Sequence, residues 1–180
     1  MVCFLPGIRA AERPLSIDFT QSHVDVAVKA TMDSFVAHLT QYEPAVMLAD
    51  DGSVLSAHLA FHFRDIVTGK AARDKAMHEW QNTGSFPDGE FALSSLRPST
   101  GSDFTALGRL TLHGVTRDIQ FPVSVSRNGA LLEIAGDAPV DTREFGLPII
   151  RMLGILKVNP LVHVRFHLKG TAPESRGSPQ

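Results

Sequence analysis

Eight histidines are the residues of this 180-residue chain that are best suited to metal chemistry, because imidazole nitrogen is a common metal ligand. Two pairs are spaced four residues apart, His58 with His62 and His163 with His167. Both pairs lie in runs of alternating apolar residues, which predict strands. Four strand residues span about 13 Å, too far for two ligands to share one ion at about 2 Å each. A shared ion would require pairing between strands, for example His58 with His167, so we predict no metal site.

Motifs for covalent catalysis or cofactor binding do not occur in the sequence. Cys3 is the single cysteine, which excludes an intramolecular disulfide and a cysteine-based zinc cage. The serines Ser94 and Ser95 in "FALSSL" lack the flanking glycines of a nucleophile elbow. His78 and Glu79 are not followed by a second histidine at the spacing of a helical zinc motif. The sequence therefore predicts no catalytic residue, metal or cofactor.

The elements that must position these side chains are mostly strands. Apolar and polar residues alternate along much of the chain, as in antiparallel strands with one buried face. The clearest case is a hairpin over 107–125, containing "LGRLTLHGVTRDIQFPV", with its turn at His113 and Gly114. Pro122 lacks a backbone donor, which predicts a ladder edge or a bulge near it. In the run from Leu55 to Phe63 the odd-numbered residues are expected to share one face. Short strands separated by turn residues indicate a sandwich or a barrel.

One segment, 69–84, breaks the strand pattern and predicts a short amphipathic helix. It begins with Thr68 as its cap and ends at Gly84. Its apolar residues at helical spacing are Ala72, Ala76, Met77 and Trp80. The helix is expected to lie across the sheet or over a barrel mouth. The alternative is that Met77 and Trp80 only fill the core.

The composition limits the class of protein. Hydrophobic residues make up 43% of the chain, which excludes general disorder. The formal net charge of -2 creates no strong field for nucleic acid or an anionic membrane. No apolar run approaches the length of a transmembrane helix, and "MVCFLPGIRA" is too short for a signal peptide. We therefore expect a single-domain cytoplasmic protein that binds no nucleic acid.

Three stretches resemble the YceI-like family of polyisoprenoid-binding proteins. "GRLTLHGVTRDIQFPV", 108–123, is similar to the family's Gly–x–Leu–Thr–(Ile/Leu)–(His/Arg/Lys)–Gly–Val–Thr pattern and the apolar strand after it. In "TREFGLP", Arg143, Phe145 and Gly146 resemble the family's Arg–x–(Asp/Glu)–Phe–Gly. "RDKAMHEW" and the later "FPDGEFALSSL" resemble its helical element and the following strand. We divide the chain into an N-terminal extension (1–14), a YceI-like domain (15–170) and a disordered tail (171–180).

The resemblance implies an all-β fold, an extended antiparallel lipocalin-like β-barrel with one short helix. It implies a long apolar lumen that holds an isoprenoid chain, such as a polyprenyl lipid or a quinone tail, and often a homodimer. The predicted function is therefore a binding or carrier protein rather than an enzyme. The residues predicted to line the lumen are Val26, Val28, Leu59, Phe61, Phe63, Phe91, Leu93, Leu110, Leu112, Phe121, Val123, Val164 and Phe166. The alternative is an ordinary closed core in a structural dimer without ligand.

Four further residues complete the predicted ligand-binding set. They are Met77, Trp80, Arg143 and Phe145. Arg143 could orient a head group, or it could instead fix its loop by pairing with a nearby carboxylate such as Asp141. Arg109, Thr111 and His113 are also head-group candidates, although they share the strand face opposite Leu110 and point outward if Leu110 points inward.

An enzyme that uses the barrel as an apolar reaction chamber is the alternative function. It requires a titratable group inside the lumen, and His38 and Glu90 are its candidates. The mostly apolar segment 149–158 is interrupted by Gly154 and flanked by prolines. It is predicted to be either a lid or a surface that packs against a second subunit.

Overall fold

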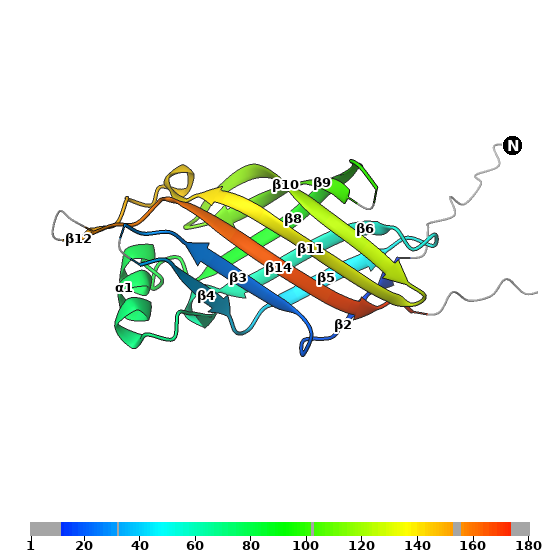
Figure 1. The fold of residues 1–180 in the computed structure, drawn as a ribbon, viewed down its shortest axis with the longest axis horizontal. Helices are drawn as coiled ribbons and strands as arrows, with labels where there is room; N and C mark the ends of the chain where they lie inside the picture. The colour runs from blue at the N-terminus through cyan, green and yellow to red at the C-terminus, as the bar shows by residue number, and fades with distance from the viewer. Residues whose placement is uncertain (1–11, 32, 102, 153–155, 174–180) are drawn as a thin grey trace, which may run out of the picture.

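A single antiparallel sheet of twelve strands curls around an apolar interior and forms most of the molecule (Figure 1). The computed structural model describes residues 12–31, 33–101, 103–152 and 156–173. Along the sheet the strand order is β1-β5-β6-β8-β9-β10-β11-β14-β3-β4-β7, and β2 pairs with β14. The curled sheet forms a half-barrel of the lipocalin-like type, which confirms the predicted fold class.

The elements have the following bounds in chain order: β1 (Arg13–Pro14), β2 (Ser16–Ile17), β3 (His23–Val28), β4 (Phe35–Leu39), β5 (Glu43–Leu48), β6 (Val54–His62), the 3-10 turn η1 (Phe63–Asp65), β7 (Ile66–Val67), α1 (Ala71–Gln81), β8 (Asp88–Pro98), β9 (Asp103–Leu112), β10 (Val115–Asn128), β11 (Leu131–Asp141), the 3-10 turn η2 (Thr142–Phe145), β12 (Arg151–Met152), β13 (Leu156–Lys157) and β14 (Leu161–Thr171).

Strands β9 and β10 form the predicted hairpin. Its turn residues His113 and Gly114 have φ angles of 50° and 70°, the pair of positive values that a two-residue type I′ turn requires. In the described residues β10 pairs with β9 from Val115 onward but with β11 only from Val123. Pro122 is therefore the last residue of the part of β10 that has no partner on its β11 side. This agrees with the predicted ladder edge, since proline has no backbone N–H to donate.

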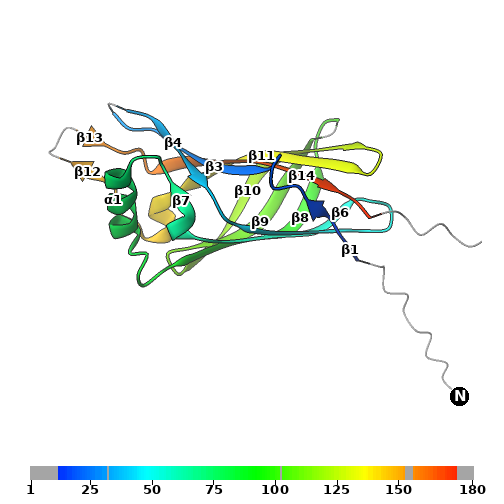
Figure 2. The ribbon, with the colours of Figure 1, turned by 90° about the horizontal axis from the view of Figure 1, so that it is seen from below.

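The N-terminal strands close the barrel at the end opposite α1 (Figure 2). β1 pairs with β5, and β2 pairs with β14. Between them, the amide of Leu15 donates to the carbonyl of Val46 at 2.8 Å. The strands therefore run from Arg13 to Thr171 and include a few residues of the predicted N-terminal extension and C-terminal tail. Residues 1–11 and 174–180 of these two segments lie outside the described residues.

Helix α1 stands across the opposite end of the barrel in both ribbon views (Figures 1 and 2). Its predicted bounds were too wide. Lys70 is the N-cap, and the chain leaves the helix at Asn82, whose φ of 52° is left-handed. Thr68 does not cap the helix: its amide and hydroxyl donate to Asp74 in the first turn. The helix is also rotated from the predicted face, because Ala72 and Ala76 are exposed while Met77 and Gln81 face inward.

Two register shifts change which side chains point into the barrel. The β5–β6 ladder shifts between Met47 and Leu48, so Val54 faces inward and Leu55 is 49% exposed. The prediction that Leu55 shares the inner face was therefore wrong. The β8–β9 ladder shifts between Leu93 and Ser95 in the same way. A bulge adds one residue to a strand and reverses the inside–outside alternation beyond it.

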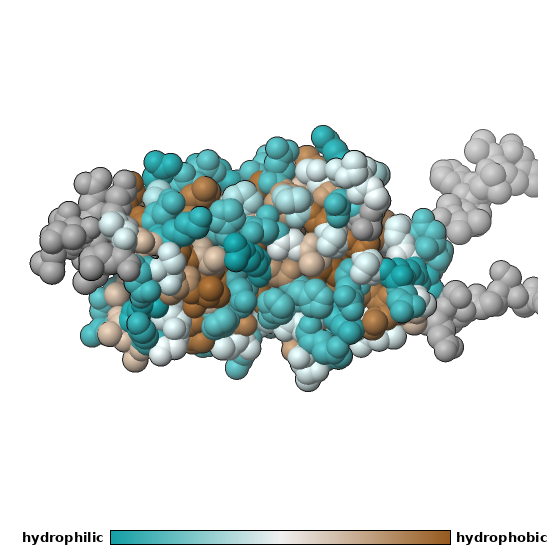
Figure 3. Space-filling model, viewed as in Figure 1, coloured by the Kyte–Doolittle hydropathy of each residue, from teal (hydrophilic) through white to brown (hydrophobic). Residues whose placement is uncertain are grey.

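The face of the molecule that carries β3, β11 and β14 shows many hydrophilic residues with smaller hydrophobic patches between them (Figure 3). Asp137 on β11 contacts Arg165 and His163 on β14, at 3.0 and 2.7 Å. The segment 149–158 contains the hairpin β12–β13, and its residues 153–155 lie outside the described residues, so its role as lid or dimer surface stays a prediction. None of the helices in the described part of the chain has the length and apolar character of a membrane-spanning helix.

Candidate ligand-binding lumen

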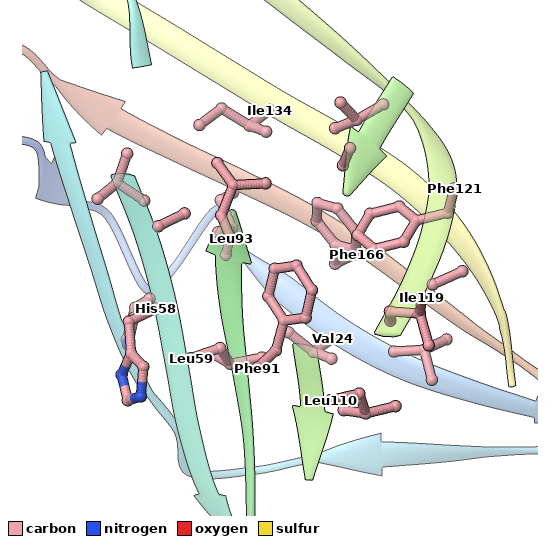
Figure 4. Close-up of a pocket in the computed structure, with 18 of the residues that line it drawn as sticks. Val24, His58, Leu59, Phe91, Leu93, Leu110, Ile119, Phe121, Ile134 and Phe166 are labelled. Carbon is pink, nitrogen blue, oxygen red and sulfur yellow. The ribbon is translucent and has the colours of Figure 1, made fainter. Parts of the chain in front are cut away.

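An elongated apolar cavity of about 160 Å³ lies inside the barrel (Figure 4). Strands from all round the curled sheet contribute to its wall. An apolar space of about this size, lined by aliphatic and aromatic side chains, can bind a small apolar molecule. The described lining contains no carboxylate, amide or hydroxyl side chain. The cavity can therefore hold hydrocarbon, and apart from the border residue His58 its described lining offers no group for acid–base chemistry.

Most of the residues predicted to line a lumen are brought together around this cavity. Those that line it are Val26, Leu59, Phe61, Phe91, Leu93, Leu110, Leu112, Phe121, Val123, Val164 and Phe166. They come from β3, β6, β8, β9, β10 and β14. Their role in binding a ligand stays a prediction.

The remaining apolar candidates lie outside the cavity wall. Phe63 is buried in η1 and belongs to a cluster with Ile66 at the α1 end, against which Met77 packs. Val28 lies at the end of β3, where it pairs with Phe35 of β4. Phe145 of η2 is buried in a cluster with Leu110 and Val140. None of these remaining candidates is part of the described cavity wall.

Trp80 and Arg143 make specific contacts away from the cavity. The indole Nε1 of Trp80 donates to the carbonyl of Pro148 at 2.8 Å, which ties α1 to the segment after η2. Nε of Arg143 donates to Asp141 Oδ1 at 2.9 Å, so Arg143 has the loop-fixing contact that the sequence left open. This hydrogen bond and the positive charge of Arg143 lower the pKa of Asp141. We find neither side chain placed to orient a head group inside the lumen.

The face opposite Leu110 points outward, as predicted. Arg109 is exposed on β9, and Thr111 hydrogen-bonds Thr116 across the hairpin at 2.9 Å. The ring of His113 packs on Phe86 with centroids 4.2 Å apart, and its Nδ1 lies 3.2 Å from the carbonyl of Phe145. None of these three residues lines the cavity.

Both candidates for a titratable lumen group lie on the outer face of the barrel. His38 contacts Asp25 at 2.8 Å, and its side chain is mostly exposed. Glu90 contacts His58 at 3.5 Å, and the ring of His58 points away from the cavity, although its residue borders it (Figure 4). The prediction that His38 or Glu90 could face the lumen was therefore wrong. Both residues alternate with the inward-facing apolar residues of their strands, so they point outward.

The strand order also separates the histidines. His58 on β6 and His167 on β14 are not on neighbouring strands, so the pairing that a shared ion would need does not form. His167 instead pairs with His23 of β3. Among the described residues, no three His, Cys, Asp or Glu side chains gather closely enough to bind a metal ion.

Three phenylalanine rings narrow the lumen in its middle. The ring of Phe121 lies 5.6 Å from that of Phe91 and 6.0 Å from that of Phe166, centroid to centroid. The three rings come from β8, β10 and β14 and meet across the lumen (Figure 4). Any chain that runs the length of the cavity must pass them.

The family model described as the YceI-like domain matches residues 15–170. The chain belongs to the YceI-like family. Its fold is similar to that of Burkholderia cenocepacia BcnA, with 21% identity, a TM-score of 0.77, and coverage of 87% of this chain and 100% of that one. A polyisoprenoid binding domain from Saccharophagus degradans has 19% identity, a TM-score of 0.68, and coverage of 89% and 99%. The Campylobacter jejuni YceI protein has 11% identity, a TM-score of 0.67, and coverage of 80% and 88%. A search of curated proteins gave no match.

Sequence reasoning missed several residues of the YceI-like lumen. Ile119, Val125 and Ile134 continue alternations that were recognised, so the pattern alone could have found them. Val54 and Leu96 lie beyond the register shifts, which carry no signal in a single sequence. The other lining residues not predicted are Val24, Leu39, Pro44, Val46, Ala57, His58, Ile66, Ala106, Ala138, Val140 and Leu168.

The α1 end of this YceI-like barrel contains buried polar groups that were not predicted, among them Gln81 and Tyr42. Gln81 is 1% exposed, and neither atom of its amide has a hydrogen-bond partner among the described residues. The buried hydroxyl of Tyr42 also has no partner in this part of the chain. Burial, with the negative charge of Asp25, raises the pKa of Tyr42. Unpaired buried polar groups are rare, and each is unfavourable by about 1–3 kcal/mol.

Proposed function

We propose that this YceI-like protein is a non-catalytic carrier that holds one isoprenoid or other single apolar chain, such as a polyprenyl or quinone tail, in its lumen. The observation that carries the proposal is the elongated cavity, whose described lining is apolar except for the border residue His58. The name of the Saccharophagus degradans relative, a polyisoprenoid binding domain, supports the same class of ligand.

The apolar lining is sufficient to bind such a chain without a polar anchor. Each buried CH₂ group contributes about 0.8 kcal/mol, so the gain grows with the number of carbons that the lumen buries. Association and ordering cost about 4–15 kcal/mol, which offsets most of this gain for short chains. Affinity should therefore rise with chain length until the lumen is filled.

Catalysis would need a reactive group that faces the ligand. Of the described lining, His58 alone is titratable, and its ring pairs with Glu90 on the outer face. This favours a carrier over an enzyme. The cytoplasmic location and the homodimer expected from the sequence stay predictions.

The test is equilibrium dialysis of the purified protein with radiolabelled geranylgeraniol, a single-chain isoprenoid alcohol. Wild-type protein should bind one equivalent. Phe61→Glu places a charge in the apolar wall and should abolish binding, because an unpaired buried charge is strongly unfavourable. Leu93→Trp fills the lumen without a charge and should also prevent binding.

Phe19→Glu is the matched control, since Phe19 is 57% exposed on the surface and should leave binding unchanged. Circular dichroism establishes that each variant is folded. Normal retention of the probe by both folded lumen variants would contradict the proposed site.

A further inference from the structure

Three of the phenylalanine rings that line the lumen each occupy the space in front of a glycine on a neighbouring strand. A β-carbon on any of these glycines would lie within 3.0 Å of the ring, a separation that real β-carbons essentially never show. The three pairs are Phe61 with Gly89, Phe91 with Gly108, and Phe166 with Gly136. Each pair joins adjacent strands of the sheet: β6 with β8, β8 with β9, and β11 with β14.

Backbone conformation does not explain these glycines. None of the three has a positive φ, so an L-residue could adopt the same backbone at each position. Because these glycines have no side chain, they instead leave space for the neighbouring phenylalanine rings. In a strand, glycine often marks a place where another group approaches closely. The missing side chains therefore allow the rings to lie back against the barrel wall rather than project into the lumen.

The clearest pair is Phe61 with Gly89, which are direct partners in the β6–β8 ladder. A β-carbon at Gly89 would lie 2.8 Å from Cε1 and 2.9 Å from Cε2 of Phe61, and closer still to Cζ. The three nearest atoms all belong to this one ring. Because the sheet lies behind the ring, a methyl group at Gly89 must push the ring toward the lumen.

The other two pairs set the width of the narrow middle. The rings of Phe91 and Phe166 both contact Phe121 across the lumen, so any inward movement would close the gap between them. The cavity is only about 160 Å³, and a displaced phenyl ring takes up a large part of such a space. One added methyl group at any of these glycines is therefore expected to change what fits in the lumen.

We propose that Gly89, Gly108 and Gly136 determine the specificity of the lumen by holding back the rings of Phe61, Phe91 and Phe166. The resulting narrow lumen admits one slender apolar chain and excludes lipids that carry two acyl chains. This inference rests on the proposed carrier function and adds the class of chain that the carrier selects.

Gly89→Ala is the most direct test. At Gly108 and Gly136 a β-carbon would also approach backbone oxygens, of Ala92 at 2.6 Å and Pro122 at 3.1 Å, so those substitutions would disturb the sheet as well. Gly89→Ala should weaken the binding of geranylgeraniol by about tenfold or more, in line with the usual effect of overpacking. Removing the ring should reverse the loss, so Gly89→Ala/Phe61→Leu should bind within about threefold of Phe61→Leu alone.

Gly84→Ala is the matched control, because Gly84 has no positive φ and nothing lies within 4 Å of the position of its β-carbon. Wild type and Gly84→Ala should bind equally, and neither should bind a diacylglycerol. Thermal denaturation establishes that Gly89→Ala is folded at the assay temperature.

The outcomes separate the two proposals. Binding by Gly89→Ala within about twofold of wild type, no rescue by Phe61→Leu, or equal binding of diacylglycerol would overturn the role of the glycines while the carrier function stands. No binding of geranylgeraniol by wild type or Gly84→Ala would overturn the carrier function and this inference with it.

Discussion

The two ends of the barrel are closed by different means. The end away from α1 is closed by a buried apolar cluster together with the strands β1 and β2, and this cluster includes Leu15, Leu48, Leu132 and Ala172. The α1 end also has buried apolar side chains, among them Phe63 and Ile66. It differs because the Gln81 amide and the Tyr42 hydroxyl are buried without partners among the described residues.

This difference indicates how stability is distributed along the barrel. Apolar burial stabilises both ends. Nε of Arg13, at the end away from α1, also has no hydrogen-bond partner among the described residues, but its Nη2 donates to the carbonyls of Ala49 and Asp50. At the α1 end, neither the Gln81 amide nor the Tyr42 hydroxyl has any such partner, so the unfavourable free energy is larger there. Local opening begins where the free energy of opening is lowest. We therefore expect the α1 end to open first, and ligand to exchange there. The following predictions test this contrast.

The largest expected effect is on global stability. Leu48 is 1% exposed in the cluster away from α1, and Leu48→Ala should lower the free energy of unfolding by about 3 kcal/mol. Met77→Ala at the α1 end removes a partly buried side chain and should lower it by less than half as much. Urea denaturation measures both, with the exposed Leu55→Ala as the control. Equal losses at the two ends would contradict the contrast.

Hydrogen exchange should show the same asymmetry in the unmodified protein. The Leu15 amide, bonded to Val46 at the end away from α1, should exchange at least about tenfold more slowly than the helical amides of α1. NMR or mass spectrometry in deuterated buffer measures both. Slower exchange in α1 than at Leu15 would contradict the claim that the end away from α1 is the more stable one.

Gln81→Met should stabilise the protein. The substitution removes an unpaired buried amide and keeps a side chain of similar length, so the free energy of unfolding should rise by about 1 kcal/mol. Gln120→Met, the same change at an exposed position of β10, should have little effect. A decrease on Gln81→Met in thermal or urea denaturation would mean that the amide has a stabilising partner.

The smallest effect concerns the turn η2 beside the α1 end. The hydrogen bond from Arg143 lowers the pKa of Asp141 in the folded protein, so the unfolded chain binds the proton more tightly. The pair therefore stabilises the fold above about pH 4, and this contribution is lost as pH falls through the folded-state pKa. In an NMR titration Arg143→Met should raise the pKa of Asp141 and leave Asp137, which contacts Arg165, unchanged. An unaltered Asp141 midpoint would show that Arg143 is not the cause.

Much of the lumen was predictable because the inside–outside alternation of a strand depends on neighbouring residues in the sequence. Leu110, Phe121 and Phe166 are each found in a short window of alternating residues, and all three line the cavity. The hairpin turn was predictable for the same reason, since Gly114 marks it locally.

The rest depends on contacts between distant segments. Leu55 was misplaced because the β5–β6 register shift arises from pairing and not from composition. The buried amide of Gln81 had no sequence signal, because a glutamine on a helix is usually exposed and the rotation of α1 is set by the barrel beneath it. The glycines facing Phe61 and Phe166 become informative only once the strands are paired.

The most direct test of the central claim is organic extraction of freshly purified wild-type protein, followed by mass spectrometry of the extract, beside the folded Phe61→Glu variant. The carrier account predicts about one equivalent of a single-chain isoprenoid or similar apolar molecule from wild type and none from the variant. An extract without such a molecule, or the same molecule in equal amount from the variant, would contradict it.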